Sequence, residues 1–198
     1  MTKFIPLTNY LEISSPAHIL YFFEEMKCYL KNMLAYIKAG IERDHHVLVL
    51  ERREIFSEVE YECKQLFSEN QLKCIHYIDN YSFYQRYGDF QINNIVKHFG
   101  EVLAPFFEKD INVRIWAHVE WNENKAVSTT LEMYERMADH RVKEMGLISV
   151  CAYSGSGLSA SLQNSLLKCH EYLMTDEVFV RSSLYKNPKL KNNETDLT

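Results

Sequence analysis

The sequence predicts an α/β fold with three layers, α/β/α, in which helices cover both faces of a mainly parallel central sheet. Short apolar runs typical of buried strands alternate along the chain with longer segments whose apolar residues recur at helical spacing. The clearest unit is the strand–helix–strand order of residues 111–121, 127–145 and 146–157. The 198 residues correspond to about one domain, and a chain of that length buries a sizeable core.

The elements before that unit are predicted from the same spacing. Residues 1–17 contain two prolines and are expected to form an irregular lead-in, and residues 18–23 are expected to form the first strand. Residues 24–39 repeat apolar side chains at helical spacing and stop before Gly40, a typical helix end. The next elements are a strand at 47–50, a helix at 55–67, a strand at 73–78, a loop or short helix at 79–90 and a helix at 92–107.

The elements after the central unit complete a single domain over residues 18–185. A last helix is expected at 158–173, and a last strand that suits a sheet edge is expected at 177–180. Residues 186–198 are polar and are expected to be a disordered tail. The chain shows no internal repeat and no linker that would divide the domain.

Composition narrows the class of protein. The net charge of −5 argues against direct binding of nucleic acid. No apolar run reaches the roughly 18 residues of a membrane span, and the N-terminal stretch lacks the apolar core of a signal peptide. An odd number of cysteines without a C-x-x-C pair predicts reduced thiols and a cytoplasmic location. The cysteines are Cys28, Cys63, Cys74, Cys151 and Cys169.

No phosphate-binding motif follows the first strand. The pattern G-x-x-x-x-G-K-[ST] is absent, and Glu24 and Glu25 stand at the start of the first helix, where two carboxylates would repel a phosphate. The small residues at 154–157 offer backbone N–H groups to an anion, although a tight strand-to-helix turn is the commoner explanation. We therefore expect no nucleotide cofactor.

The histidines and cysteines show no spacing typical of a metal site or an enzyme. There is no H-x-x-x-H or H-E-x-x-H, so no metal ligand is predicted, while a zinc site assembled from distant residues stays open. Cys151 at a strand end, with His170 on the next helix, has the composition of a thiol nucleophile, but a buried structural cysteine is the commoner reading. Without a catalytic motif, we expect no enzyme.

Polar and aromatic residues follow the two central strands where each strand ends. Glu120 and Trp121 come after the first, and Tyr153 ends the second. In open α/β sheets, ligands bind beyond the carboxyl ends of such strands. Glu120 is therefore either a hydrogen-bonding group at the sheet end or part of a ligand pocket.

A series of short motifs runs through residues 18–188, nearly the whole chain. In one-letter code they are HILYFFE at 18–24, LxxMLxYIxAGIE at 30–42, HVLVL at 46–50, YxxYGDF at 84–90, VRIxxxVEW at 113–121, YE at 134–135, VCAY at 150–153, CH at 169–170 and, as a weaker match, LYKNP at 184–188. In this order they resemble the MEDS domain, a sensory domain named for methanogens, methylotrophs and a dichloromethane-responsive repressor. The resemblance implies a bacterial or archaeal signalling domain that senses small hydrocarbon derivatives. It also implies a fold similar to P-loop ATPases of the circadian-clock type, P-loop-NTPase-like but without a phosphate-binding loop.

These observations favour a stand-alone sensor that binds a small, largely apolar ligand and signals through a partner protein, such as a histidine kinase or a transcription regulator. Family members often carry such an output domain in the same chain, and this chain shows none. The expected pocket residues are His18, Glu120, Trp121, Cys151 and Tyr153. His18 stands at the start of a parallel strand, which would place it at the opposite end of the sheet from the others. It is included only because the family resemblance implies it.

Two other functions stay open. One is a ligand-free interaction module, a relic ATPase core that docks on a kinase or a transcription factor and shows an exposed aromatic patch. The other is an enzyme that uses Cys151 or Glu120. A homo-oligomer is compatible with each of them.

Overall fold

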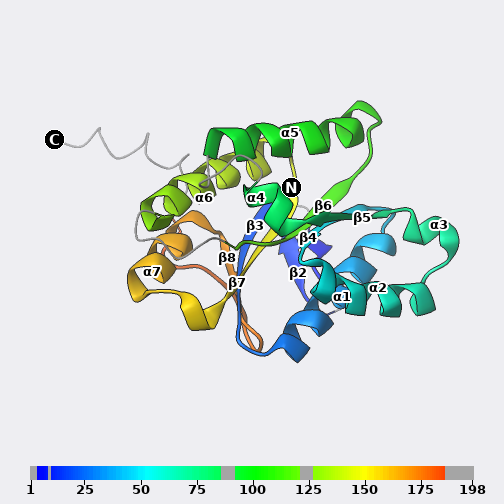
Figure 1. Ribbon diagram of the computed structural model, residues 1–198, viewed down its shortest axis with the longest axis horizontal. Helices are drawn as coiled ribbons and strands as arrows, with labels where there is room; N and C mark the ends of the chain where they lie inside the picture. Colours follow the sequence, from blue (N-terminus) through cyan, green and yellow to red (C-terminus); the bar gives the residue numbers. More distant parts are fainter. Residues whose placement is uncertain (1–3, 9, 86–91, 121–126, 186–198) are drawn as a thin grey trace.

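A seven-stranded sheet lies between two layers of helices in the computed structural model, which describes residues 4–8, 10–85, 92–120 and 127–185 (Figure 1). The strand order is β5-β4-β6-β7-β3-β8-β9, and every neighbouring pair is parallel except β8 with β9. The strands are β3 (Ala17–Phe23), β4 (His46–Glu51), β5 (Ile75–Asp79), β6 (Val113–His118), β7 (Ile148–Ser154), β8 (Tyr172–Met174) and β9 (Phe179–Arg181). The helices are α1 (Met26–Ile41), α2 (Arg53–Leu66), α3 (Glu69–Leu72), α4 (Asn80–Gln85), α5 (Ile92–Glu108), α6 (Val127–Glu144) and α7 (Ala160–Cys169), with a 3₁₀ turn at Gly155–Gly157. The predicted three-layer fold is confirmed.

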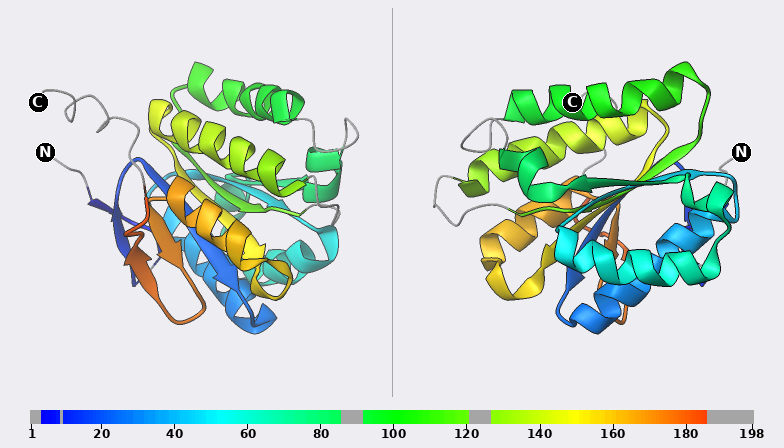
Figure 2. Two further views of the ribbon diagram at one scale, coloured as in Figure 1. Left: turned by 90° about the vertical axis from the view of Figure 1, so that its left-hand side faces the viewer. Right: turned by 45° about the vertical axis from the view of Figure 1, so that its right-hand side comes forward.

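Each face of the sheet supports its own hydrophobic core. Helices α1 and α2 cover one face, and α5, α6 and α7 cover the other (Figure 2). Alternate residues of β3 point to opposite cores, Ile19 and Tyr21 toward α1 and Leu20 toward α6. The central strands β4, β6 and β7 are buried over nearly their whole length, as expected of parallel strands covered on both faces.

The N-terminal segment is a β-hairpin, so the prediction of an irregular lead-in was wrong. Strands β1 (Phe4–Pro6) and β2 (Glu12–Ser14) pair in antiparallel fashion, and Ile13 is buried in the core under α1. The fully buried Arg114 ties the hairpin to the sheet, because its Nη1 donates to the carbonyl oxygen of Pro6 at 3.2 Å. Strands of three residues are too short to show a periodic pattern.

The last predicted helix ends earlier than expected and is followed by a strand. Helix α7 stops at Cys169, and His170 has extended backbone angles with φ −117°. The His170 ring hydrogen-bonds the carbonyl oxygen of Leu166 at 2.8 Å, which satisfies one of the open carbonyls at the helix end. The chain then enters β8, parallel to β3, and returns as β9, which confirms the predicted edge strand.

The N-terminus of α1 is occupied by a carboxylate from far along the chain. Asp176, in the turn between β8 and β9, accepts hydrogen bonds from the backbone N–H groups of Glu24 (3.0 Å) and Glu25 (2.8 Å). Its other oxygen accepts from the Tyr21 hydroxyl at 2.6 Å. A negative charge at this position stabilises the helix, since the first backbone N–H groups have no partner within the helix.

Helix α5 continues through Pro105 to Glu108, although a proline inside a helix removes one backbone hydrogen bond.

The predicted tail at 186–198 lies outside the described residues. Within the part of the chain that is described, no helix is long and apolar enough to cross a membrane.

Candidate functional site

Four side chains that bind metals well in proteins meet in the core between the sheet and helices α6 and α7. His18 comes from β3, Cys151 from β7, Glu135 from α6, and His170 from the residue after α7. One ligand atom from each lies within 4.8 Å of the others, and all four residues are buried. We call these four residues the buried centre.

The atoms of the buried centre approach one another closely, but only some of them form hydrogen bonds. His18 Nε2 lies 3.3 Å from Cys151 Sγ and 3.5 Å from Glu135 Oε2. His170 Nε2 lies 3.3 Å from the same carboxylate oxygen, and the two imidazole rings stack with centroids 3.9 Å apart. Glu135 Oε2 and His170 Nε2 are fully buried and have no hydrogen-bond partner among the described residues. Such unsatisfied atoms are uncommon in a native core.

The outer nitrogens of both imidazoles face backbone carbonyl oxygens. His170 Nδ1 lies 2.8 Å from the carbonyl oxygen of Leu166, and His18 Nδ1 lies 3.3 Å from that of Cys169. A carbonyl only accepts, so each Nδ1 carries the proton, and each Nε2 turns its lone pair toward the centre. Burial lowers the pKa of His18, which keeps that ring neutral, the form that binds a metal ion.

The remaining contacts surround the centre with polar groups. The Tyr153 hydroxyl donates to Glu135 Oε1, and Asp139 Oδ1 lies 3.6 Å from His18 Nδ1. Burial, with the Glu135 carboxylate beside it, raises the pKa of the Cys151 thiol well above its usual value. Without a bound cation, Cys151 therefore stays protonated and is a poor nucleophile.

The donor set fits a tetrahedral divalent ion. Zn²⁺ binds imidazole nitrogen and carboxylate oxygen at about 2.0–2.2 Å and thiolate sulfur at about 2.3 Å. Tetrahedral ligands at those lengths lie roughly 3.3–3.7 Å apart. Three pairs of ligand atoms are 3.3–3.5 Å apart, and all four atoms lie within 4.8 Å of one another. The hydroxyl of Tyr153 and the carbonyl of Leu166 are the second layer of contacts that usually orients such ligands.

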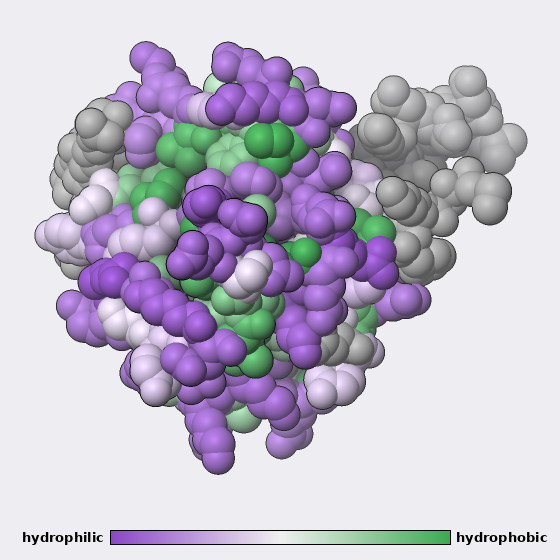
Figure 3. Space-filling view, turned by 90° about the vertical axis from the view of Figure 1, so that its right-hand side faces the viewer, coloured by the Kyte–Doolittle hydropathy of each residue, from purple (hydrophilic) through white to green (hydrophobic). Residues whose placement is uncertain are grey.

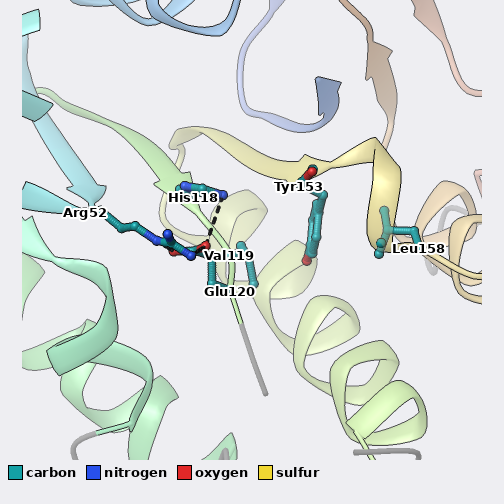
Figure 4. Close-up of a pocket in the computed structure, with 8 residues that line it drawn as sticks. Arg52, His118, Val119, Glu120, Tyr153 and Leu158 are labelled. Carbon is teal, nitrogen blue, oxygen red and sulfur yellow. Dashed lines mark hydrogen bonds and ion pairs between the residues drawn. The ribbon is translucent and has the colours of Figure 1, made fainter. Parts of the chain in front are cut away.

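A separate pocket of about 240 Å³ opens at the carboxyl ends of β6 and β7 (Figure 4). Glu120 lies at this edge, where Arg52 donates to it through Nε at 2.7 Å and again through Nη2, and Asn80 donates at 2.7 Å. Burial raises the pKa of Glu120, but these hydrogen bonds and His118 outweigh it, so the net shift is downward and the carboxylate stays ionised. The walls are Arg52, His118, Val119, Glu120, Tyr153, Ser154, Gly157 and Leu158.

The structure divides the predicted pocket residues between two places. His18 and Cys151 lie in the buried centre, and Glu120 lies in the pocket at the sheet edge. Tyr153 belongs to both, because it lines the pocket while its hydroxyl contacts Glu135. Trp121 lies outside the described residues. His18 does sit near the start of β3, yet its ring reaches Cys151, because its strand partner Ser149 is two residues before that cysteine.

Sequence reasoning missed the acidic members of the site. Glu135 and Asp139 are four residues apart on α6 and lie on its buried face with Leu131 and Val142. Two carboxylates on the apolar stripe of a helix are the signal that points to them, because buried acids need a partner. His170 was singled out only as a companion of Cys151.

Comparisons with known proteins agree with this fold. A KaiC-like protein from Pyrococcus horikoshii OT3 superposes with a TM-score of 0.54 at 11% identity, covering 82% of this chain and 72% of that one. The ATPase domain of G40P gives 0.52 at 10% identity, covering 80% and 68%. At such identities the likeness shows the fold alone, which is that of P-loop NTPases. No curated protein matched the sequence.

The family model of the MEDS domain, described as the MEthanogen/methylotroph, DcmR Sensory domain, matches residues 17–171. The match begins with β3, ends just beyond α7, and contains all four residues of the buried centre. A sensory role in signalling follows from that description. Because the match spans most of the 198 residues, this chain belongs to the MEDS family.

Proposed function

We propose that this sensory domain holds a divalent metal ion of the zinc class in its buried centre, and that the metal-bound centre is where the signal is received. The observation that carries the proposal is the convergence of two imidazoles, one carboxylate and one thiol within 4.8 Å. The residues are His18, Glu135, Cys151 and His170.

The energetics of burial support a cation at this position. A buried polar atom without a partner costs about 1–3 kcal/mol, and both Glu135 Oε2 and His170 Nε2 are in that state. One bound ion would satisfy these two atoms together with His18 Nε2, and it would stabilise the thiolate form of Cys151. The lone pairs of both Nε2 atoms already point inward.

The side chains around Cys151 are largely apolar, which supports a small, largely apolar molecule as the ligand. On the side facing α5 and α6, Cys151 lines an enclosed cavity of about 20 Å³. That volume is close to the minimum for one water molecule, so a ligand would have to displace α5 or α6, and that movement would be the signal. The apolar members of the wall are Leu50, Val96, Phe99, Ile115, Ala117, Ala138 and Val142.

The output of this sensor would pass to a separate partner protein. Among the described residues, the exposed aromatic side chains lie on three different helices and in the loop between β1 and β2, and this spread does not favour the alternative of a ligand-free docking module. These side chains are Tyr10, Tyr61, Tyr81 and Phe107. Figure 3 shows apolar areas separated by hydrophilic side chains on the face that carries α3 and β5. Native mass spectrometry of protein isolated from its host tests this part, because it detects both a retained ligand and a bound partner.

Metal binding is tested with Co²⁺ as a spectroscopic probe, since a thiolate ligand gives an intense charge-transfer band in the near ultraviolet. We expect the wild-type chain to bind about one equivalent of Co²⁺ or Zn²⁺ with that band. Cys151→Ala should remove the band and weaken binding at least about tenfold. Cys63→Ala is the matched control, because Cys63 is also buried but lies in the opposite core, and it should leave the band unchanged. Equal binding by the wild-type chain and by Cys151→Ala would contradict the proposal.

A further inference from the structure

The β8–β9 hairpin and the turn after it, residues 171–185, follow directly after the last member of the buried centre. His170 is the residue before this segment. The segment adds the last two strands to the sheet beside β3 and lies at its outer edge (Figure 2). We call residues 171–185 the C-terminal hairpin.

The first connection between the centre and the C-terminal hairpin runs through the main chain. The Glu171 N–H donates to the carbonyl oxygen of His18 at 3.1 Å, so the backbones of both imidazoles adjoin the start of the hairpin. The Ser182 N–H, after β9, donates to the carbonyl oxygen of Glu171 at 2.8 Å. Both ends of the hairpin therefore meet beside His18 and His170.

The second connection runs through side chains. The Tyr185 hydroxyl donates to Asp139 Oδ2 at 3.0 Å, and the other oxygen of Asp139 lies 3.6 Å from His18 Nδ1. Lys143 completes this contact, with its Nζ 3.2 Å from the Asp139 carboxylate and 4.0 Å from the centre of the Tyr185 ring. Asp139 is only 5% exposed, so Tyr185 and Lys143 link a buried group next to the centre with the surface.

We propose that the C-terminal hairpin is the output element of the buried centre, so that occupancy of the centre by a metal ion controls how firmly the hairpin is held. The inference rests on the metal site proposed above. A metal ion fixes the positions of His18 and His170. The hairpin bonds to the backbone of His18, and Asp139, which accepts from Tyr185, lies 3.6 Å from the His18 ring, so ordering the centre orders the hairpin. Val180 on β9 and Val178 just before it are about half exposed, so the change reaches the surface.

Hydrogen exchange of the full chain, followed by mass spectrometry with excess Zn²⁺ and again with EDTA, measures this coupling. In the wild-type protein, Zn²⁺ should slow backbone exchange in residues 172–185 by at least about tenfold. The Tyr185→Phe variant loses only one hydroxyl and should bind the same amount of Zn²⁺. The logarithm of the factor by which Zn²⁺ slows exchange in residues 172–185 should be less than half the wild-type value. Tyr61→Phe, at an exposed tyrosine on α2, is the control and should behave as wild type.

The outcomes separate the two proposals. If Zn²⁺ binds and exchange in the hairpin does not change, the output role is wrong while the metal site stands. If Tyr185→Phe keeps the full effect of Zn²⁺, the contact with Asp139 does not transmit it, and this inference also fails. If the wild-type chain binds no Zn²⁺, the proposed function and this inference both fall.

Discussion

At the scale of single residues, the fully buried Arg114 shows how the fold accommodates a charge in its core. No carboxylate among the described residues pairs with it; its partners are the carbonyl oxygens of Pro6 and Leu7 and the ring of His45. Its side chain also passes over Gly40 in the last turn of α1, where the helix carries partial negative charge. Burial lowers the pKa of Arg114, but an arginine keeps its proton at neutral pH.

This packing predicts that Gly40 cannot accept a side chain without cost. A Cβ atom there would lie 2.7 Å from Val47 Cγ2 and 3.0 Å from Arg114 Cδ. Gly40→Ala should therefore lower the free energy of unfolding by about 1–3 kcal/mol. Gly100→Ala is the control in α5, where a Cβ meets nothing within 4 Å, and it should raise stability by roughly 0.5–1 kcal/mol. Urea denaturation of both variants checks this, and a stable Gly40→Ala would show that the contact relaxes freely.

At the scale of elements, the strands in the middle of the sheet were predicted from apolar runs, while β5 was predicted from alternating polar and apolar residues and β9 from a short apolar run. β3, β4, β6 and β7 are buried on both faces, so apolar residues dominate each of them without a regular polar alternation. The strands that were missed, β1, β2 and β8, have three residues each, too few for any period. They form only because other elements are already in place: β8 pairs with β3, and Arg114 bonds the first hairpin.

The candidate site was predicted only in part, because some of its residues meet only through packing between elements that are distant in the sequence. Cys151 and Tyr153 stand at the end of a recognisable strand, and His18 came from the family resemblance. Glu135 and His170 join them through the packing of α6 and α7 on the sheet, and a single sequence contains no record of which helix faces meet. Glu120, predicted for a pocket, does line one, but that pocket is distinct from the buried centre.

The contact between β4, β5 and α5 predicts a dependence of stability on pH. His46 Nδ1 lies 2.8 Å from His76 Nε2, and both rings pack against Phe106 of α5. Burial lowers the pKa of both histidines, and the neighbouring His46 lowers that of His76 further. The folded chain therefore binds fewer protons than the unfolded chain below about pH 6.5, so stability should fall as the pH drops through that value and should not depend on this pair above it.

Chemical denaturation between pH 5 and pH 8, in the presence of EDTA, measures this effect. His76→Gln should flatten the fall in stability below pH 6.5, because one of the two titrating rings is gone. His140→Gln, at an exposed histidine on α6, is the matched control and should follow the wild-type profile. An unchanged profile in His76→Gln would assign the pH dependence to other groups.

At the scale of the whole molecule, the fold is that of P-loop NTPases, while the parts that handle phosphate are absent from the sequence. No glycine-rich loop follows β3, and Glu24 and Glu25 stand at the start of α1. The fold alone therefore assigns no activity to this chain, since function depends on the sites that a fold carries.

We predict that the purified protein does not hydrolyse ATP. With Mg²⁺ and ATP, phosphate release should stay at the buffer rate, because the helix start that would face a phosphate carries carboxylates instead. The Glu120→Gln variant separates a true activity from a contaminant. Hydrolysis above background that disappears in Glu120→Gln would show that the chain is an ATPase after all.

The carboxylate of Asp176 at the start of α1 competes with any phosphate for the same backbone N–H groups. This anion is part of the chain, so it competes with dissolved anions as an intramolecular ligand, at an effective concentration of at least about millimolar. It is also held by two backbone N–H groups and the Tyr21 hydroxyl. A phosphate in solution would have to displace this tethered ligand to reach the N–H groups of Glu24 and Glu25, just before α1.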